Sequence, residues 1–497
     1  MQTNLRAPRS PFDRLPRRAA IGVAAAAVCA AMALGGLVSA AQAATPSTTT
    51  DVILLVGADE SQRVVNWYAT APTPQVVQVA LSSKVKKGEF PADALTFDAV
   101  VAPNTVNGGY NAHATIAGLE ENKKYSYRVG GDGAWSPTYD FGTRNFGASN
   151  FDFLFFGDPQ IGSSGNLAKD QAGWVDTMNV AVGANPNAEL LVSGGDQVET
   201  ANTEAQWDAF LAPTQLRSVP WVATIGNHDV GGKAYEQHLW TPNTDRGPQY
   251  YKTNTATESG GDYWFEYRDT LFIDLNSNAY STSAAGVDAD QAHLAYVRSV
   301  VGAHGADADH IVLVYHHSIY SPADHANDAD NQKRRLDFPT AFSDLGVDLV
   351  LQGHDHSYSR SYEIKNGQKA NPDEQPGQDE VFQGPGGVIY VTANSASGSK
   401  YYDLTDPIVG SSYGPDPLNP DNHWANSVEN QEHVRSYIKV SVHDKQLQVE
   451  AIRSGTCAAP NAAVELGKVK WCGPDEGASS ALPVGSTIDK VVIHTAK

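Results

Sequence analysis

Residues 151–160 read FDFLFFGDPQ, and this stretch decides the fold. The apolar run from Phe153 to Phe156 is short, aromatic and followed at once by Gly157, which favours a buried β-strand. Asp158 comes directly after that strand. Ligands of open α/β sheets bind beyond the carboxyl ends of the strands, so we expect Asp158 to lie where a site would form.

The same arrangement recurs four times along the chain, with longer helical stretches between the runs, as in α/β architecture. Each apolar run ends in a tail that contains Asp, Asn or His. The four runs and their tails are Leu190-Leu191-Val192 with Gly195-Asp196, Trp221-Val222-Ala223-Thr224-Ile225 with Gly226-Asn227-His228-Asp229, Ile311-Val312-Leu313-Val314 with His316-His317, and Val347-Asp348-Leu349-Val350-Leu351 with Gly353-His354-Asp355-His356. We expect the five tails to converge on one place.

The residue types in these tails indicate a metal site. One Gly-Asp or Gly-Asn-His after a strand commonly caps a helix or turns the chain. Five tails that supply carboxylate, amide and imidazole donors form a set that suits divalent transition metals. The donors exceed the needs of one tetrahedral ion. Two ions that share a bridging carboxylate are therefore predicted, an arrangement suited to displacement at phosphorus.

In this order, the five tails resemble the motifs of the calcineurin-like metallophosphoesterases. The segments Tyr125-Ser126-Tyr127-Arg128-Val129-Gly130 and His316-His317-Ser318-Ile319-Tyr320 resemble the purple acid phosphatase branch of that family. The resemblance spans roughly residues 50–452. It implies an α/β fold, with a metallophosphoesterase β-sandwich flanked by helices and preceded by a small all-β domain of the fibronectin type III kind.

The resemblance also implies a role for each matching residue. The implied metal ligands are Asp196 as the bridge, Asp158 and His356 at the first ion, and Asn227, His316 and His354 at the second. His228 would hydrogen-bond the substrate phosphate or protonate the leaving alkoxide as a general acid. His325 falls where the branch keeps a substrate-facing histidine. The alternative for His325, and for His317, is an exposed loop histidine.

Two positions depart from the relatives' pattern. Calcineurin-like enzymes generally place a histidine two residues after the first aspartate, where this chain has Gln160, and purple acid phosphatases place a tyrosine where this chain has Glu199. Gln160 or Glu199 would add an oxygen ligand, directly or through water, or would only hydrogen-bond the ligands. The cofactors are two divalent or trivalent ions, Fe, Mn, Zn, Mg or Ca, and an oxygen-rich shell favours the harder ones over Zn.

The predicted domains follow changes in pattern. Residues 51–145 show alternating β-branched and aromatic runs, which predict the small all-β sandwich. Residues 44–50 form a linker, 151–452 the catalytic domain and 453–497 a tail that the pattern does not place. Residues 364–387 are polar and rich in Gly and Pro, which predicts a loop.

The N-terminus predicts export. Residues 1–43 hold five arginines, including Arg17-Arg18, then an apolar run and Ala41-Gln42-Ala43, which together indicate a signal peptide of the twin-arginine or ordinary secretory type. The alternative is a membrane anchor. Cleavage would leave a secreted or periplasmic protein without a stable membrane anchor, in which Cys457 and Cys472 are expected to form a disulfide.

Charge limits the partners. Lys and Arg number 35 against 56 Asp and Glu, a net charge of −21, which argues against binding of nucleic acid beyond nucleotide substrates. We expect a small phosphorylated substrate, attracted by bound cations. The expected function is an exported phosphomonoesterase that resembles acid phosphatases. The alternative is a phosphodiesterase on nucleotides or glycerophosphodiesters, and a third hypothesis is an inactive metal-bearing binding protein.

Overall fold

The computed structural model describes residues 48–131, 133–147, 149–455 and 482–496. The predicted signal segment and the predicted Cys457–Cys472 disulfide lie outside the described residues. Among the residues that are described, no helix combines the length and the apolar character that crossing a membrane requires.

The largest sheet contains eleven strands. They are β1 (Thr49–Val56), β2 (Arg63–Ala69), β5 (Val100–Pro103), β6 (Tyr110–Ile116), β10 (Phe151–Phe156), β11 (Leu190–Ser193), β12 (Trp221–Val222), β20 (Glu380–Phe382), β23 (Ser436–His443), β24 (Gln446–Arg453) and β25 (Thr487–His494). Their order is β20-β25-β24-β23-β10-β11-β12-β1-β2-β6-β5. The strands β10, β11 and β12 run parallel, so their carboxyl ends share one edge.

A second sheet of seven strands packs against the first. Its strands are β13 (Tyr263–Tyr267), β14 (Thr270–Leu275), β15 (His310–Tyr315), β16 (Leu349–Gln352), β17 (Tyr358–Ser361), β21 (Ile389–Thr392) and β22 (Asn426–Asn430). Buried apolar side chains from both sheets form one core between them, in which the ring of Phe153 on β10 packs edge-on against Phe272 on β14. The strands β14, β15 and β16 are parallel.

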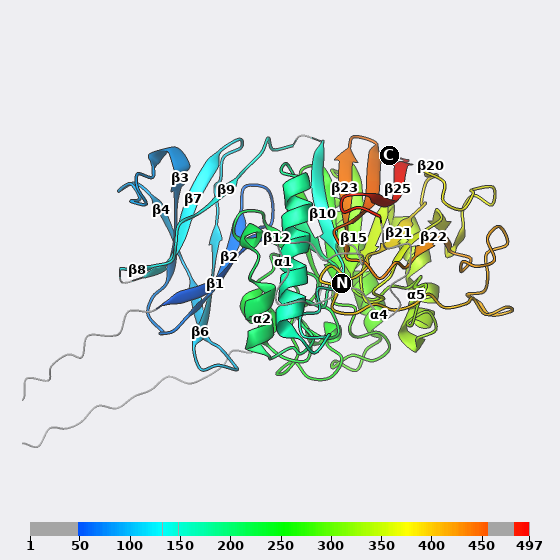
Figure 1. The fold of residues 1–497 in the computed structure, drawn as a ribbon, viewed down its shortest axis with the longest axis horizontal. Helices are drawn as coiled ribbons and strands as arrows, with labels where there is room; N and C mark the ends of the chain where they lie inside the picture. Colours follow the sequence, from blue (N-terminus) through cyan, green and yellow to red (C-terminus); the bar gives the residue numbers. More distant parts are fainter. Residues whose placement is uncertain (1–47, 132, 148, 456–481, 497) are drawn as a thin grey trace, which may run out of the picture. The chain divides into compact units, whose positions relative to one another are not determined.

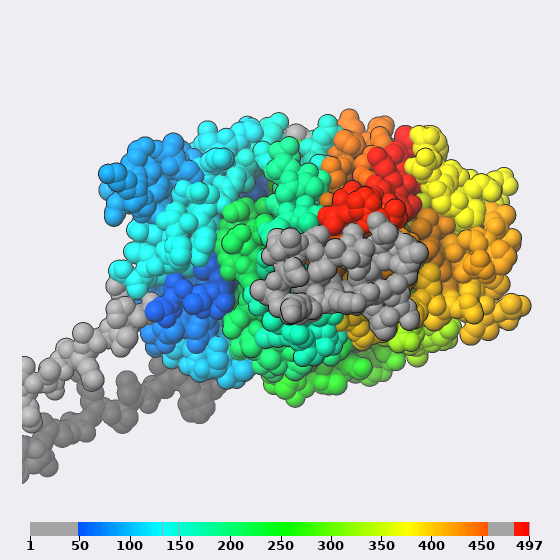
Figure 2. Space-filling model, in the orientation of Figure 1, coloured from blue at the N-terminus to red at the C-terminus, as the bar shows by residue number. Residues whose placement is uncertain are grey.

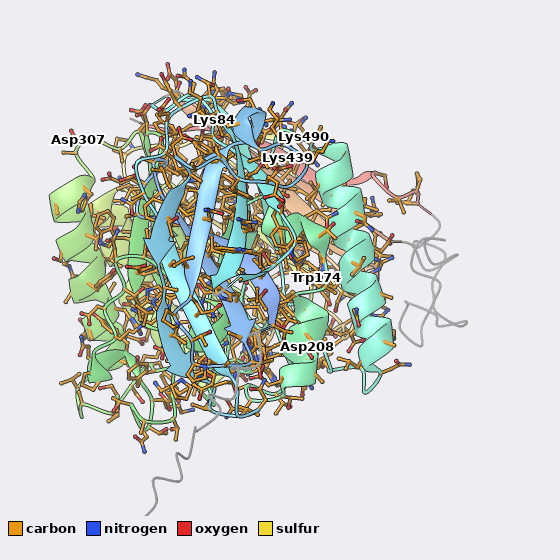
Figure 3. All side chains as sticks on the ribbon, turned by 90° about the vertical axis from the view of Figure 1, so that its left-hand side faces the viewer. Lys84, Trp174, Asp208, Asp307, Lys439 and Lys490 are labelled. Carbon is orange, nitrogen blue, oxygen red and sulfur yellow. The ribbon has the colours of Figure 1, made fainter. Side chains whose placement is uncertain are left out.

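Helices cover the outer faces of both sheets. The helices are α1 (Leu167–Ala184), α2 (Glu204–Phe210), α3 (Ala234–His238), α4 (Ala289–His304) and α5 (Ala329–Leu345), with short 3-10 turns at Ser82–Lys84, Thr214–Arg217 and Pro248–Tyr250. Trp174 of α1 packs on the first sheet, and Phe338 of α5 on the second. Figure 3 shows α1, with Trp174 labelled, and α4, which ends shortly before the labelled Asp307, on opposite sides of the strands. The predicted fold class is confirmed.

The N-terminal sandwich shares a strand with the catalytic sheet (Figure 1). Its second sheet consists of β3 (Val76–Leu81), β4 (Leu95–Asp98), β7 (Lys124–Gly131), β8 (Ala134–Trp135) and β9 (Tyr139–Gly142). Strand β1 pairs with β12 on one side and β2 on the other. Both of its faces are buried: Val52 and Leu54 enter the sandwich core, whereas Ile53 and Leu55 enter the core under α1. The sandwich is thus joined to the catalytic sheet through a common strand.

Two segments that the sequence pattern left without structure contain strands. Residues 364–387 include β20 and a small hairpin of β18 (Ile364–Lys365) and β19 (Gln368–Lys369). In the C-terminal tail, β25 pairs antiparallel with β24 and parallel with β20. Figure 2 shows β25 in red at the surface, between the orange region of β24 and the yellow region of β20.

Candidate metal centre

Both sheets deliver polar side chains to one place. Asp158, Asp196 and Asn227 follow β10, β11 and β12 of the first sheet, and His316 and His354 follow β15 and β16 of the second. All are buried except Asn227, which is exposed. Ligand atoms of Asp196, His316 and His354 lie within 4.8 Å of one another, a group that could hold a metal ion. The predicted convergence of the tails is therefore observed at this edge.

Both ring nitrogens of His316 lie close to hydrogen-bond acceptors. Its Nδ1 lies 2.8 Å from the carbonyl oxygen of Gly194, which only accepts, so Nδ1 carries a proton. Its Nε2 then faces Asn227 Oδ1 at 3.0 Å, His354 Nδ1 at 3.2 Å and Asp196 Oδ2 at 3.3 Å. The two oxygens only accept hydrogen bonds, so a single Nε2 proton cannot satisfy both, whereas a cation between these atoms can bind them all.

The pKa shifts of His316 and His354 agree with a site that attracts positive charge. Burial by itself would lower the pKa of His316, but the carboxylates of Asp196 and Asp158 outweigh burial and raise the pKa to about 10. Burial and the charge of neighbouring histidines lower the pKa of His354 well below its ordinary value. The His354 ring therefore stays neutral and keeps a nitrogen lone pair available as a ligand.

Asp158 and His356 form the other half of the centre. The Nδ1 of His356 donates to the Lys400 carbonyl at 2.9 Å, which leaves the Nε2 lone pair facing Asp158 Oδ2 at 3.3 Å. Both Asp158 oxygens also accept from the backbone N–H of His354. A nitrogen lone pair and a carboxylate oxygen repel each other at that distance unless a proton or a cation lies between them.

Gln160 is completely buried beside these residues. Its Nε2 donates to Glu199 Oε2 at 2.8 Å. Because a carboxylate only accepts, this contact fixes the amide with Oε1 pointing away from Glu199. Among the described residues, Gln160 Oε1 is a buried oxygen without a hydrogen-bond partner. Such an atom costs about 1–3 kcal/mol unless something binds it, and an amide oxygen is a good ligand for a hard cation.

The backbone at the centre is locally unusual. Gln160, Asp196, His354 and His356 all have positive φ angles, between 37° and 73°, a region that residues with a side chain rarely adopt. Glycines make the close approaches there, because a Cβ at Gly226 would collide with the Asp196 carboxylate. Strain of this kind clusters at functional sites and persists because the surrounding structure holds it.

His228 lies at the edge of the centre and contacts Asp196 through its backbone. Its N–H donates to Asp196 Oδ1 at 2.9 Å, and its ring Nδ1 donates to the Glu199 carbonyl at 2.9 Å. The side chain is 29% exposed. The Nδ1 contact leaves the other ring nitrogen, Nε2, outside this hydrogen bond.

A cleft of about 460 Å³ opens beside the centre. Its lining includes Asn227 and His354 together with His317 and His325. His317 is 7% exposed and hydrogen-bonds Ser277 Oγ at 2.8 Å, so it is buried and not an exposed loop residue. The ring of His325 stacks on that of His354, with 3.8 Å between the ring centroids. Both histidines therefore line the space that a substrate would enter.

Sequence reasoning assigned no role to four residues that shape this region. Asp229 accepts from the backbone N–H groups of Gln197 and Gly226, and Asp355 accepts from those of Ala323 and His325. These two carboxylates follow the histidines of the tails and hold the loops through these hydrogen bonds. The other two are Lys252, which lines the cleft, and Tyr402, whose ring centroid lies 5.2 Å from that of His356. No strand-end motif marks either of them.

Comparison with known proteins agrees with this architecture. Residues 49–143 match the model of the purple acid phosphatase N-terminal domain, and residues 151–358 match that of the calcineurin-like phosphoesterases. An uncharacterized protein of Mycobacterium tuberculosis is 25% identical over 280 residues, 51% of each chain. Purple acid phosphatase 18 of Arabidopsis thaliana is 26% identical over 267 residues, 52% of this chain and 55% of the relative. This chain thus spans about half the length of the curated relatives it matches.

A solved structure extends the likeness to most of the fold. The purple acid phosphatase from seeds of yellow lupin (Lupinus luteus) superposes with a TM-score of 0.64 at 16% identity, covering 90% of this chain and 74% of the lupin chain. The two domain matches fall on the N-terminal sandwich and on the strands that carry the candidate metal centre. Residues 151–358 thus belong to the calcineurin-like phosphoesterase family, and residues 49–143 match the N-terminal domain of the purple acid phosphatases.

Proposed function

We propose that this protein is an exported phosphomonoesterase that uses two metal ions. The observation that carries the proposal is the excess of acceptors over protons around His316 Nε2, repeated between His356 Nε2 and Asp158. Two positions that each require positive charge, at the edge shared by both sheets, suit a pair of cations.

The contacts support the ligand set that the sequence predicts. Asp158 and His356 would hold the first ion and Asn227, His316 and His354 the second, and Asp196, which faces His316, would serve both. When bound, the two ions supply a water made acidic by coordination and a clamp for the phosphate oxygens. The neighbouring hydrogen bonds of the ligand rings, to the carbonyls of Gly194 and Lys400, fix their orientation.

Gln160 completes the first position through its amide oxygen, and Glu199 orients the amide. The support is the Glu199 hydrogen bond on one side of the amide and the buried, unpartnered Oε1 on the other. Oxygen ligands from Asp158, Asp196 and Gln160, with a single imidazole, favour Mn, Mg, Ca or Fe over Zn at this position.

His228 acts on the substrate. With Nδ1 committed to the Glu199 carbonyl, a protonated Nε2 hydrogen-bonds the phosphate or donates its proton to the leaving alkoxide. His325 flanks the entrance of the cleft, where Asp328 holds its Nδ1 at 2.7 Å. It contacts the leaving group there.

Export rests on the sequence of residues 1–43, with its arginine-rich start, apolar run and Ala41-Gln42-Ala43. Expression in the source cells, followed by fractionation and N-terminal sequencing of the recovered protein, tests this part. A mature chain that begins near Ala44 outside the cytoplasm is expected. A chain that still begins at Met1 in the cytoplasm would refute export and leave the catalytic proposal standing.

The catalytic proposal is tested with the purified mature protein. Its metal content is measured, and phosphate release from p-nitrophenyl phosphate is compared with cleavage of bis(p-nitrophenyl) phosphate. We expect about two metals per chain and a higher kcat/KM for the monoester. A preference for the bis-ester would make the protein a phosphodiesterase, and metal binding without turnover of either ester would make it a binding protein.

A further inference from the structure

The cleft beside the metal centre is lined by residues of two kinds. Asn227 and His354 belong to the centre and His317 and His325 follow its strands, whereas Lys252, Asn278 and Tyr280 come from other segments. Its volume of about 460 Å³ is that of a small-molecule site. A phosphate held at the centre would leave this space to the alcohol part of the ester.

One buried carboxylate, that of Glu258, holds the loop that carries Lys252. Glu258 is 6% exposed, and its two oxygens accept from the backbone N–H groups of Lys252 at 2.6 Å and Thr253 at 2.8 Å. Lys233 donates to the Glu258 carbonyl from the other side. These contacts fix the backbone from which the Lys252 side chain reaches the cleft.

The charged groups of the cleft differ in how they are paired. Asp328 accepts from His325 Nδ1 at 2.7 Å, and Asp330 accepts from Arg334 Nη1 at 2.8 Å. The Lys252 ammonium has no hydrogen bond or ion pair within the part of the chain that is described. Lys252 is thus the charged group of the cleft that is left to bind a ligand.

We infer that Lys252 determines specificity by binding an anionic group, a carboxylate or second phosphate, on the leaving group of a phosphomonoester. The inference rests on the proposed function and names its substrate class. The phosphate to be released would lie at the metal centre, and the second anionic group would lie against the Lys252 ammonium. In this placement the ammonium binds a group other than the phosphate that is released, so it would contact substrate and transition state alike and act on KM more than on kcat.

Two substrates of nearly equal size test the inference. Glycerol 3-phosphate and 3-phosphoglycerate share their phosphate and their chain length, and they differ in a terminal hydroxymethyl group against a carboxylate. We expect the wild type to favour 3-phosphoglycerate. Lys252→Ala should raise KM for 3-phosphoglycerate about three- to tenfold and change KM for glycerol 3-phosphate less than about twofold. Lys252→Arg should keep the preference, and Lys252→Glu should reverse it.

Controls separate this contact from a general change in charge. Lys84→Ala removes the same charge in the N-terminal domain, where Figure 3 labels Lys84, and should leave both KM values unchanged. Inhibition by inorganic phosphate should also be unchanged in Lys252→Ala, because phosphate binds at the metal centre. Added salt should shrink the wild-type preference, since the Lys252 side chain is exposed.

The outcomes are distinguishable. Equal losses for both substrates in Lys252→Ala, or no loss for either, would overturn the inference and leave the phosphomonoesterase standing. A wild type that releases phosphate from neither substrate, nor from p-nitrophenyl phosphate, would overturn the proposed function and the inference with it.

Discussion

The two halves of the metal centre differ in how they are made. Around His316, acceptors from Asn227, His354 and Asp196 lie within 3.3 Å of one nitrogen, and every one of them stands in a strand-end motif. Around Asp158, the contact at 3.3 Å is with His356, and the further ligand that we propose is the buried, unpartnered amide oxygen of Gln160. The half around His316 depends on residue types, whereas the half around Asp158 depends on the orientation that Glu199 gives to the Gln160 amide.

The largest effect should come from Asp196, the residue that we propose to serve both metal ions. Asp196→Ala removes the carboxylate that faces His316 and binds the N–H of His228, so we expect loss of both metals and of activity. Metal binding also contributes to folding free energy, and the variant should melt at a lower temperature. Metal analysis, phosphate release and thermal unfolding measure the three effects.

Asp152→Ala is the matched control for that substitution. Asp152 is a partly exposed carboxylate on β10 that pairs with Lys439 at 3.0 Å, away from the centre. It should keep both metals and its activity. Full turnover by a metal-free, chelator-treated wild-type protein would refute the proposal that hydrolysis depends on metal ions.

The contrast between the halves also shows what the sequence could predict. Each tail donor was readable because a parallel sheet aligns the carboxyl ends of its strands, as β10, β11 and β12 do. The hydrogen bond from Gln160 to Glu199 could not be predicted from a pattern, since it joins residues 39 positions apart and depends on the backbone conformation at each of them. Lys252 was also missed, because a loop carries it and no periodic pattern marks it.

The fold shows the same division. Alternating runs predicted the sandwich and apolar runs predicted the catalytic strands, but the continuity between them was not foreseen. Strand β1 buries Leu54 and Leu55 in two different cores, and a run of apolar residues alone does not tell which neighbours it will have. The place of β25 was missed because the pairing partners β24 and β20 are distant in sequence.

The second largest effect on activity should come from His228, and its substitution should leave both metal positions intact. His228→Ala removes the ring that faces the substrate and keeps the backbone N–H that binds Asp196. We expect kcat to fall about 10²- to 10⁴-fold, the usual contribution of general acid–base catalysis, with unchanged metal content. Steady-state kinetics and metal analysis of one preparation decide the matter, and loss of a metal would show that His228 is a ligand.

Substitution of Gln160 should separate the two halves. Gln160→Ala removes the amide oxygen, and we expect the affinity of the first position to fall at least about 10- to 100-fold while the second keeps its metal. Titration with Mn²⁺, followed by electron paramagnetic resonance, counts the occupied positions without any assay of activity. Gln160→His supplies an imidazole ligand in place of the amide oxygen, so this variant should bind Mn²⁺ at both positions.

Glu199 offers a further control on the amide. Glu199→Gln can donate as well as accept, so it no longer fixes the orientation of Gln160 and should weaken the first position by less than Gln160→Ala does. If Gln160→Ala binds two metals as tightly as the wild type, the amide oxygen is not a ligand. The half around Asp158 would then hold its ion without Gln160.

The smallest effect is spectroscopic and concerns the tyrosine that the purple acid phosphatases have where this chain has Glu199. The protein loaded with ferric iron should lack the visible tyrosinate-to-iron band. Glu199→Tyr should stay colourless too, because the amide oxygen of Gln160, whose Nε2 donates to Glu199, is the ligand that we propose at this position. A band gained by that variant would place residue 199 at the metal. A band in the wild type would point to Tyr402, whose ring lies beside His356, and Tyr402→Phe would then remove it.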